Sequence, residues 1–205
     1  MRCIFLSLLL VLSISLSGKN FSDTSLTTIQ ITTLATLAKT WGFLKYYHPA
    51  VAKGRYDWDS VLIKKIPAFI RAGKTAEINS LIAEWLDELG DIGNSAEHNY
   101  SLSDAVLYNL DTAWILNSGF DKKIITRLQT IRKQKREGQH HYYEKGQSWQ
   151  IKIKNENPYN TASFLYPSAD WRLLILFRYW NIVNYFSPYK YLAGEDWNKV
   201  LTRFI

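Results

Sequence analysis

Cysteine and histidine are scarce in this chain of 205 residues, which holds one Cys and four His. A single Cys excludes a disulfide framework, and the small number of Cys and His argues against a structural zinc module, which takes four such ligands. The basic excess is moderate, with a formal charge of +7, and it does not indicate a nucleic-acid partner. Hydrophobic residues make up 47% of the chain, which is enough to build a buried core and too many for a disordered tail.

The familiar catalytic motifs are missing as well. The sequence contains no G-x-S-x-G, H-E-x-x-H, P-loop or G-x-G-x-x-G pattern. His140 and His141 are adjacent, so they would point in different directions in a strand or a helix and would share a metal poorly. His48 precedes a proline, where we expect a structural cap. We expect three acidic residues to begin helices rather than to form a catalytic pair: Asp57, Asp59 and Asp196. The sequence therefore predicts no catalytic, cofactor-binding or metal-binding residue, and it leaves ligand-binding residues open.

The first segment has the composition of a secretory signal peptide. Arg2 precedes an uncharged run from Cys3 to Gly18, whose apolar part is too short to cross a membrane comfortably. Ser15 and Ser17 place small residues at positions −3 and −1 for cleavage before Gly18. We predict a signal peptide over 1–17 and export to the periplasm or the cell exterior, with an uncleaved anchor as the alternative. Cleavage would remove the only Cys, which suits an oxidising compartment.

Most of the remaining chain has apolar residues at helical spacing. We expect a flexible lead-in over 18–33, a polar loop over 90–110, and a short strand over 148–154, where apolar and polar residues alternate. Pro67 should kink or divide the second helix, and Gly73, Gly90 and Gly138 should end the second, third and fourth helices. The helices are predicted over 34–48, from 57, over 78–89, over 121–136 and over 170–186.

The predicted helix over 121–136 has a strongly basic face. Such a face suits either an anionic partner, such as phospholipid or nucleic acid, or plain contact with water. Because no aromatic residues are interleaved with the basic ones, we favour the solvated face.

An internal repeat is the most informative feature of the sequence. A shift of 139 residues, without a gap, superposes two stretches rich in tryptophan and tyrosine. Each copy consists of a helix, a turn terminated by proline, a capping Asp-Trp pair and a second helix. We expect each copy to be a helical hairpin with a Trp pair between its helices. The matched positions are Trp41 and Trp180, Tyr46 and Tyr185, Pro49 and Pro188, Asp57 and Asp196, and Trp58 and Trp197.

The repeated aromatic residues have two interpretations. They could form a groove for a peptide or a sugar, or they could form the core between helices. Aromatic residues at helical spacing usually pack against one another, so we favour the core.

The fold class predicted from these patterns is mostly α, with two repeated helical hairpins and a small β element between them. The second copy stops at Ile205, opposite Ile66 of the first, so we expect this copy to be truncated and the chain to be a fragment. The predicted divisions are a signal peptide (1–17), a lead-in (18–33), a helical domain with the first copy (34–138), a strand and loop (139–169) and the second copy (170–205).

Three segments resemble the amino-terminal region of a peptidase family. They are the stretch from Trp41 to Gly54 with the following Tyr56-Asp57-Trp58-Asp59, the stretch from Asn155 to Tyr159, and the stretch from Arg172 to Tyr191 with Glu195-Asp196-Trp197. These segments resemble secreted serine peptidases of the C-terminal-processing (tail-specific, tricorn-core) family, in the form common in Bacteroidetes-type bacteria. The likeness extends over nearly all of 34–205.

The resemblance implies a non-catalytic helical region upstream of a hydrolase. In that family, a PDZ-like domain and an α/β peptidase domain follow, and the peptidase domain carries the serine nucleophile with its lysine or histidine partner. No position of this sequence matches those motifs, so no catalytic residue can be transferred and we expect no activity from this chain alone. The expected partners are the downstream domains and a peptide substrate, without nucleic acid or any cofactor. The alternative is a free-standing exported helical module that binds peptide or glycan.

Overall fold

The computed structural model describes residues 25–90, 92, 112–134, 139–146, 150–159 and 166–205. Of these residues, 66% are helical, and a small two-stranded antiparallel sheet lies between the helical parts. The predicted fold class, a mostly α chain with a small β element between two hairpins, is confirmed. The predicted signal peptide over 1–17 lies outside the described residues, as does nearly all of the predicted loop over 90–110.

The first hairpin consists of α1 (Thr28–Tyr47), the short α2 (Pro49–Ala52) and α3 (Trp58–Arg71). The lead-in expected over 18–33 is wrong for its last six residues, because α1 begins at Thr28. Thr27 and Gln30 form a capping box, in which each side chain accepts a hydrogen bond from the backbone of the other residue. The helix ends at Tyr47, before Pro49, as expected from the conformational restriction on the residue that precedes proline.

Helix α3 begins where the sequence predicts. The Asp57 carboxylate accepts a hydrogen bond of 3.1 Å from the backbone N–H of Ser60 and so caps the helix. Pro67 was expected to kink or divide this helix, yet α3 continues past it to Arg71. Pro67 lies on the exposed side, where water can replace the hydrogen bond that proline cannot donate. The helix ends with Ala72 as its C-cap, one residue before Gly73.

An outer layer of helices covers the first hairpin. It consists of α4 (Thr75–Leu89), the 3-10 turn η2 (Ala113–Ile115) and α5 (Lys122–Lys133). Gly90 ends α4 with a positive φ of 78°, as the sequence predicted. Helix α5 buries Ile124, Leu128 and Ile131, and it ends at Lys133, three residues before the expected end. The expected stop at Gly138 lies outside the described residues.

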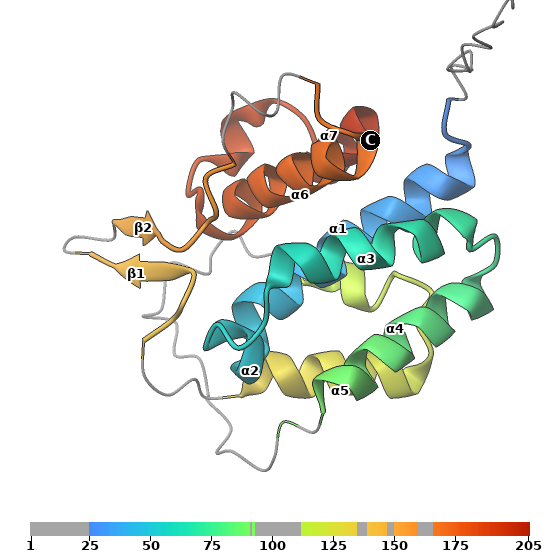
Figure 1. Cartoon of the computed structure of the whole chain (residues 1–205), viewed down its shortest axis with the longest axis horizontal. Coiled ribbons are helices and arrows are strands. Elements are labelled where there is room, and N and C mark those ends of the chain that lie inside the picture. The colour runs from blue at the N-terminus through green and yellow to red at the C-terminus, as the bar shows by residue number, and fades with distance from the viewer. Residues whose placement is uncertain (1–24, 91, 93–111, 135–138, 147–149, 160–165) are drawn as a thin grey trace, which may run out of the picture.

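The small sheet joins β1 (Tyr143–Lys145) to β2 (Ile151–Ile153) in antiparallel register, with Tyr143 opposite Ile153. Strand β2 confirms the strand predicted over 148–154 in its central part. Strand β1 was not predicted, because its sequence Tyr-Glu-Lys is too short to show alternation. The hairpin and the following loop bring residues 155–159 back towards α1 and α3 (Figure 1).

The second hairpin consists of α6 (Ala169–Phe186), the 3-10 turn η4 (Lys190–Ala193) and α7 (Trp197–Phe204). Both hairpins are closed by the same pair of hydrogen bonds. The Trp41 indole donates to the Trp58 carbonyl at 2.9 Å, and the Trp58 indole donates to the Trp41 carbonyl at 3.1 Å. In the second copy, Trp180 and Trp197 make the same two bonds at 2.8 and 3.2 Å. The repeat found in the sequence is therefore also a repeat of structure.

The two hairpins pack about an approximate two-fold axis between α1 and α6. In two-fold packing, a contact between residue i of one copy and residue j of the other is matched by the contact of j with i. Tyr46 lies 4.9 Å from Phe186 between ring centroids, and the matching pair, Tyr47 and Tyr185, lies at 6.0 Å. Tyr46 also meets its own equivalent, Tyr185, at 5.0 Å, as residues close to the axis do.

Gly42 and its repeat equivalent Asn181 mark the same axis. A Cβ at residue 42 would collide with the Asn181 side-chain amide, so only glycine permits this approach. The Asn181 amide donates to the carbonyls of Ala38 at 3.0 Å and of Phe177 at 2.8 Å. Those two acceptors are themselves repeat equivalents, which places Asn181 almost on the axis.

The helices form three layers (Figure 1). Helices α1 and α3 lie in the middle, α6 and α7 pack on one side of them, and α4 packs on α3 from the other side, with α5 next to α4 in the same outer layer. The aromatic core lies where the layers meet, around Trp41, Trp58 and Trp85. Among the helices of the described ranges, none combines the length and the apolar character required to cross a bilayer.

Candidate functional site: a buried cluster of charged side chains

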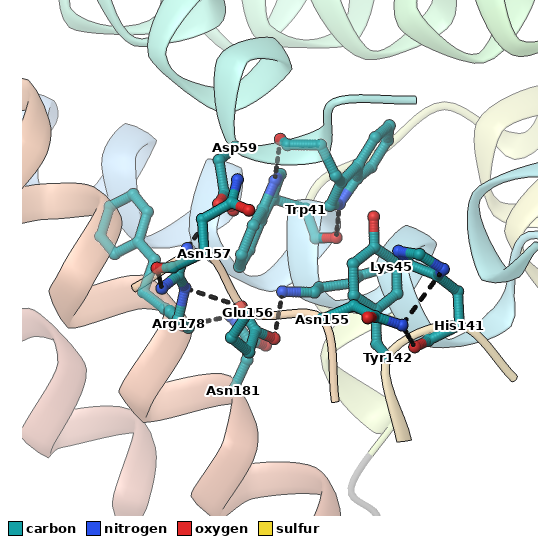
Figure 2. Close-up of polar contacts among 12 residues, drawn as sticks. Trp41, Lys45, Asp59, His141, Tyr142, Asn155, Glu156, Asn157, Arg178 and Asn181 are labelled. Carbon is teal, nitrogen blue, oxygen red and sulfur yellow. Dashed lines mark hydrogen bonds and ion pairs between the residues drawn. The ribbon is translucent and has the colours of Figure 1, made fainter. Parts of the chain in front are cut away.

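Four separate parts of the chain bring charged side chains together beneath the β hairpin. Lys45 comes from α1, Asp59 from α3, Glu156 from the loop after β2, and Arg178 from α6 (Figure 2). Lys45 Nζ lies 2.6 Å from Glu156 Oε1, and Arg178 Nε lies 2.8 Å from Glu156 Oε2. The Arg178 guanidinium also pairs with the Asp59 carboxylate. We call these four residues the charged cluster.

Lys45 is the most enclosed member of the charged cluster, with its side chain almost entirely removed from solvent. Its ammonium lies 4.7 Å from the Trp41 ring centroid and 4.5 Å from that of Tyr142, so two aromatic faces flank the charge. Burial lowers the pKa of Lys45, and the neighbouring Glu156 carboxylate opposes that shift. Burial also raises the pKa of Tyr142, and the nearby carboxylates add to the effect.

Arg178 joins the two carboxylates of the charged cluster. Its guanidinium also donates to the backbone carbonyl of Asn157 at 3.1 Å, which holds the loop after β2 against α6. Burial alone would lower the pKa of Arg178, but Asp59 and Glu156 outweigh burial and raise it. The Tyr159 hydroxyl donates to Asp59 at 2.6 Å. Burial and that hydrogen bond raise the pKa of Tyr159 to about 12.

The loop that delivers Glu156 is held by Asn155. Asn155 has a φ of 53°, in the left-handed region that asparagine tolerates better than most residues. Its side-chain amide donates to the His141 carbonyl at 2.7 Å, as Figure 2 shows. The turn therefore places residue 156 towards α1 and α6.

The three histidines in the described ranges occupy different environments. His48 caps the end of α1, as expected, and is buried; burial, aided by the charge of Arg127, lowers its pKa to about 4. His140 stacks on Tyr143 with ring centroids 4.0 Å apart, whereas His141 lies against the amide of Asn155. Within the described ranges, no group of three or more His, Cys, Asp or Glu side chains is placed to hold a metal ion.

All three residues expected at helix starts lie there, and two of them cap their helices. Asp57 caps α3, and the Asp196 carboxylate accepts a hydrogen bond of 2.9 Å from the backbone N–H of Asn198 at the start of α7. Asp59 lies in the first turn of α3, as expected, but its carboxylate does not cap the helix and instead turns inward to Arg178 and Tyr159. The repeated aromatic residues lie in the core, as favoured from the sequence: Trp41, Tyr46, Trp180 and Tyr185 are all buried.

The charged cluster was missed from the sequence. Its members are distant from one another in the chain. One signal was available, because Lys45 falls within the aromatic segment from Trp41 to Tyr47, where an isolated cation needs a buried partner. Nothing in one sequence identifies Glu156 as that partner.

The charges of the cluster are paired with one another within the protein. Two cations meet two carboxylates, and both carboxylates of the cluster are engaged by a cation within the protein. The fold and this site define a helical domain of two-fold-related hairpins that is tied to its β hairpin by a buried ion-pair network. Comparisons with protein-family models, with curated proteins and with solved structures find no match.

Proposed function

We propose that this chain is a non-catalytic helical support domain of an exported serine peptidase of the C-terminal-processing family. In this proposal the parent enzyme hydrolyses peptide bonds, and the catalytic and PDZ-like domains are other parts of the same protein. The family part of the proposal depends on the three segments that resemble that family. The support role depends on the arrangement of the charged cluster.

The observation that carries the support role is the mutual pairing within the charged cluster. A catalytic lysine or carboxylate needs access to substrate, but Lys45 is enclosed by Trp41, Tyr142 and Glu156. A buried ion-pair network instead fixes the relative positions of the elements that supply it. Here those elements are α1, α3, α6 and the loop after β2.

Peptidase assays on the purified chain test this proposal. We expect no hydrolysis of casein or of a peptide with an apolar carboxyl-terminal tail, with either the unmodified chain or Lys45→Met. Hydrolysis that persists through purification and disappears in Lys45→Met would contradict a support role. The family assignment has a separate test, which is whether the reading frame beyond Ile205 encodes a PDZ-like segment and a serine-containing peptidase module.

The alternative of a module that binds peptide or glycan has a specific structural requirement. It needs several of Trp41, Tyr46, Trp180 and Tyr185 exposed on one surface, and all four are buried. Acrylamide quenching of tryptophan fluorescence tests this point in solution. We expect a blue-shifted, weakly quenched emission from the core tryptophans, whereas ready quenching of Trp41 in single-Trp variants would revive the alternative.

A further inference from the structure

Helix α6 is apolar on both of its faces. Its inner face packs on α1 and α3 through Leu174, Phe177 and Trp180. Its outer side has apolar residues at i, i+4 and i+7, namely Ile175, Tyr179 and Ile182. Ile175 is 46% exposed and Tyr179 is 63% exposed. A helix with apolar side chains on two of its sides is normally covered on both.

Helix α7 has a matching apolar stripe. Trp197, Val200 and Phe204 follow the i, i+3 and i+7 pattern, and Phe204 is 63% exposed. Trp197 is half-buried, although its repeat equivalent Trp58 is fully buried. We call the two stripes together the outer face of the second hairpin: Ile175, Tyr179, Ile182, Trp197, Val200 and Phe204.

The equivalent face of the first hairpin shows which kind of element packs on such a surface. Trp58, the equivalent of Trp197, stacks on Trp85 of α4 with ring centroids 5.5 Å apart. Phe43, the equivalent of Ile182, meets the edge of Trp114 of η2 at 6.2 Å. The first hairpin is therefore covered by an amphipathic helix that places a tryptophan on the hairpin's own Trp pair. Among the described residues, no helix covers the second hairpin in this way.

The charged side chains of α4, which covers the first hairpin, are opposite in sign to those of α7 in the second hairpin. Helix α4 carries only acidic charged side chains and is joined to α3 by a pair between Lys65 and Glu88 at 2.8 Å. Helix α7 carries only basic ones, and Arg172 of α6 and Lys199 of α7 are exposed. The two hairpins differ at the position that pairs with Glu88. The first hairpin has Lys65 there, whereas the second has the apolar Phe204. A partner of the second hairpin should therefore have an apolar residue where α4 has Glu88.

We propose that the outer face of the second hairpin is a docking site for an acidic amphipathic helix that bears a tryptophan. The tryptophan of the partner helix stacks on Trp197, and an apolar side chain one turn later contacts Phe204. Its acidic residues lie near Arg172 of α6. This inference depends on the approximate two-fold symmetry and not on the peptidase assignment, so either can fail without the other.

Synthetic helical peptides test the proposal in calorimetric titrations of the whole chain. The first peptide has the sequence of residues 74–91 with Glu88→Leu, which supplies the tryptophan and the apolar contact for Phe204. We expect it to bind, and we expect the peptide with Trp85→Ala as well to lose about tenfold in affinity, as the loss of an aromatic anchor does. Replacing Glu77 and Glu84 by Lys should also weaken binding, with a marked dependence on salt. Equal binding of all three peptides would overturn the proposal.

Variants of the chain locate the binding site. Tyr179→Ser and Phe204→Ser change exposed side chains, so the fold should persist, and each should weaken binding by about tenfold. Leu116→Ser is the matched control, because Leu116 is an apolar residue exposed to a similar degree elsewhere, and it should leave binding unchanged. Binding that is insensitive to Tyr179→Ser and Phe204→Ser contradicts the proposal. So does sedimentation that shows the chain pairing with a second copy through this face.

Discussion

At the scale of single residues, buried charges and their partners decide most of the chemistry of this protein. Asp59 and Arg178 lie at an interface between α3 and α6, where both side chains are largely buried. Removing one partner of a buried pair leaves an uncompensated charge, whereas an exposed pair contributes little. The charged cluster is therefore the place where single substitutions should be most harmful.

Asp59→Asn should lower the free energy of unfolding by about 3 kcal/mol, because the charged cluster is then left with two cations and one carboxylate. Glu195→Gln removes the carboxylate of an exposed pair with Arg203 and should cost less than about 1 kcal/mol. Urea unfolding followed by circular dichroism measures both values. Equal losses in the two variants would show that the charged cluster contributes no more than a surface pair.

His48 should make the stability depend on pH. Its pKa in the folded chain is about 4, below the usual 6.5, so the unfolded chain binds the proton more tightly. Stability should therefore be complete above about pH 6.5 and should decline as the pH falls towards 4, by up to about 3 kcal/mol from this residue. His48→Gln should remove that part of the pH dependence in urea titrations at several pH values. An unchanged difference between the two proteins from pH 7 to pH 4 would contradict the assignment.

At the scale of elements, the unit is a helical hairpin closed by two indole–carbonyl hydrogen bonds. The sequence was sufficient to predict these hairpins, because Trp, Pro and Asp recur at fixed spacing and each has a local role. The sequence was not sufficient for the charged cluster or for β1. The cluster depends on contacts between residues more than a hundred positions apart, and β1 has only three residues.

Replacing the tryptophan that begins the second helix of each hairpin should cost the two hairpins different amounts of free energy of unfolding. Trp58→Phe removes a hydrogen bond and part of the stacking on Trp85, whereas Trp197→Phe removes the same bond at a half-buried site without that stacking partner. We expect losses of about 2 kcal/mol for Trp58→Phe and about 1 kcal/mol for Trp197→Phe. Chemical denaturation of both variants measures this difference, and a larger loss for Trp197→Phe would contradict the layer arrangement.

At the scale of the whole molecule, one approximate two-fold axis explains most of the packing. It explains why α1 requires glycine at residue 42, why Asn181 can bond to both Ala38 and Phe177, and why the tyrosines meet in matched pairs. The two hairpins differ in one respect within the described part of the chain: α4, η2 and α5 cover the first hairpin only. The proposed docking face depends on this arrangement.

Exchanging the two residues on the axis tests the two-fold arrangement most directly. Gly42→Asn alone would place two amides in one space, and Asn181→Gly alone would remove two buried hydrogen bonds, so each should lower the free energy of unfolding by about 3 kcal/mol. In the double variant, the amide introduced at position 42 would reach the same two carbonyls from the other side. We predict that the free energy of unfolding of the double variant, measured in urea, will fall within about 1 kcal/mol of that of the unmodified chain. Losses that simply add would contradict the two-fold arrangement.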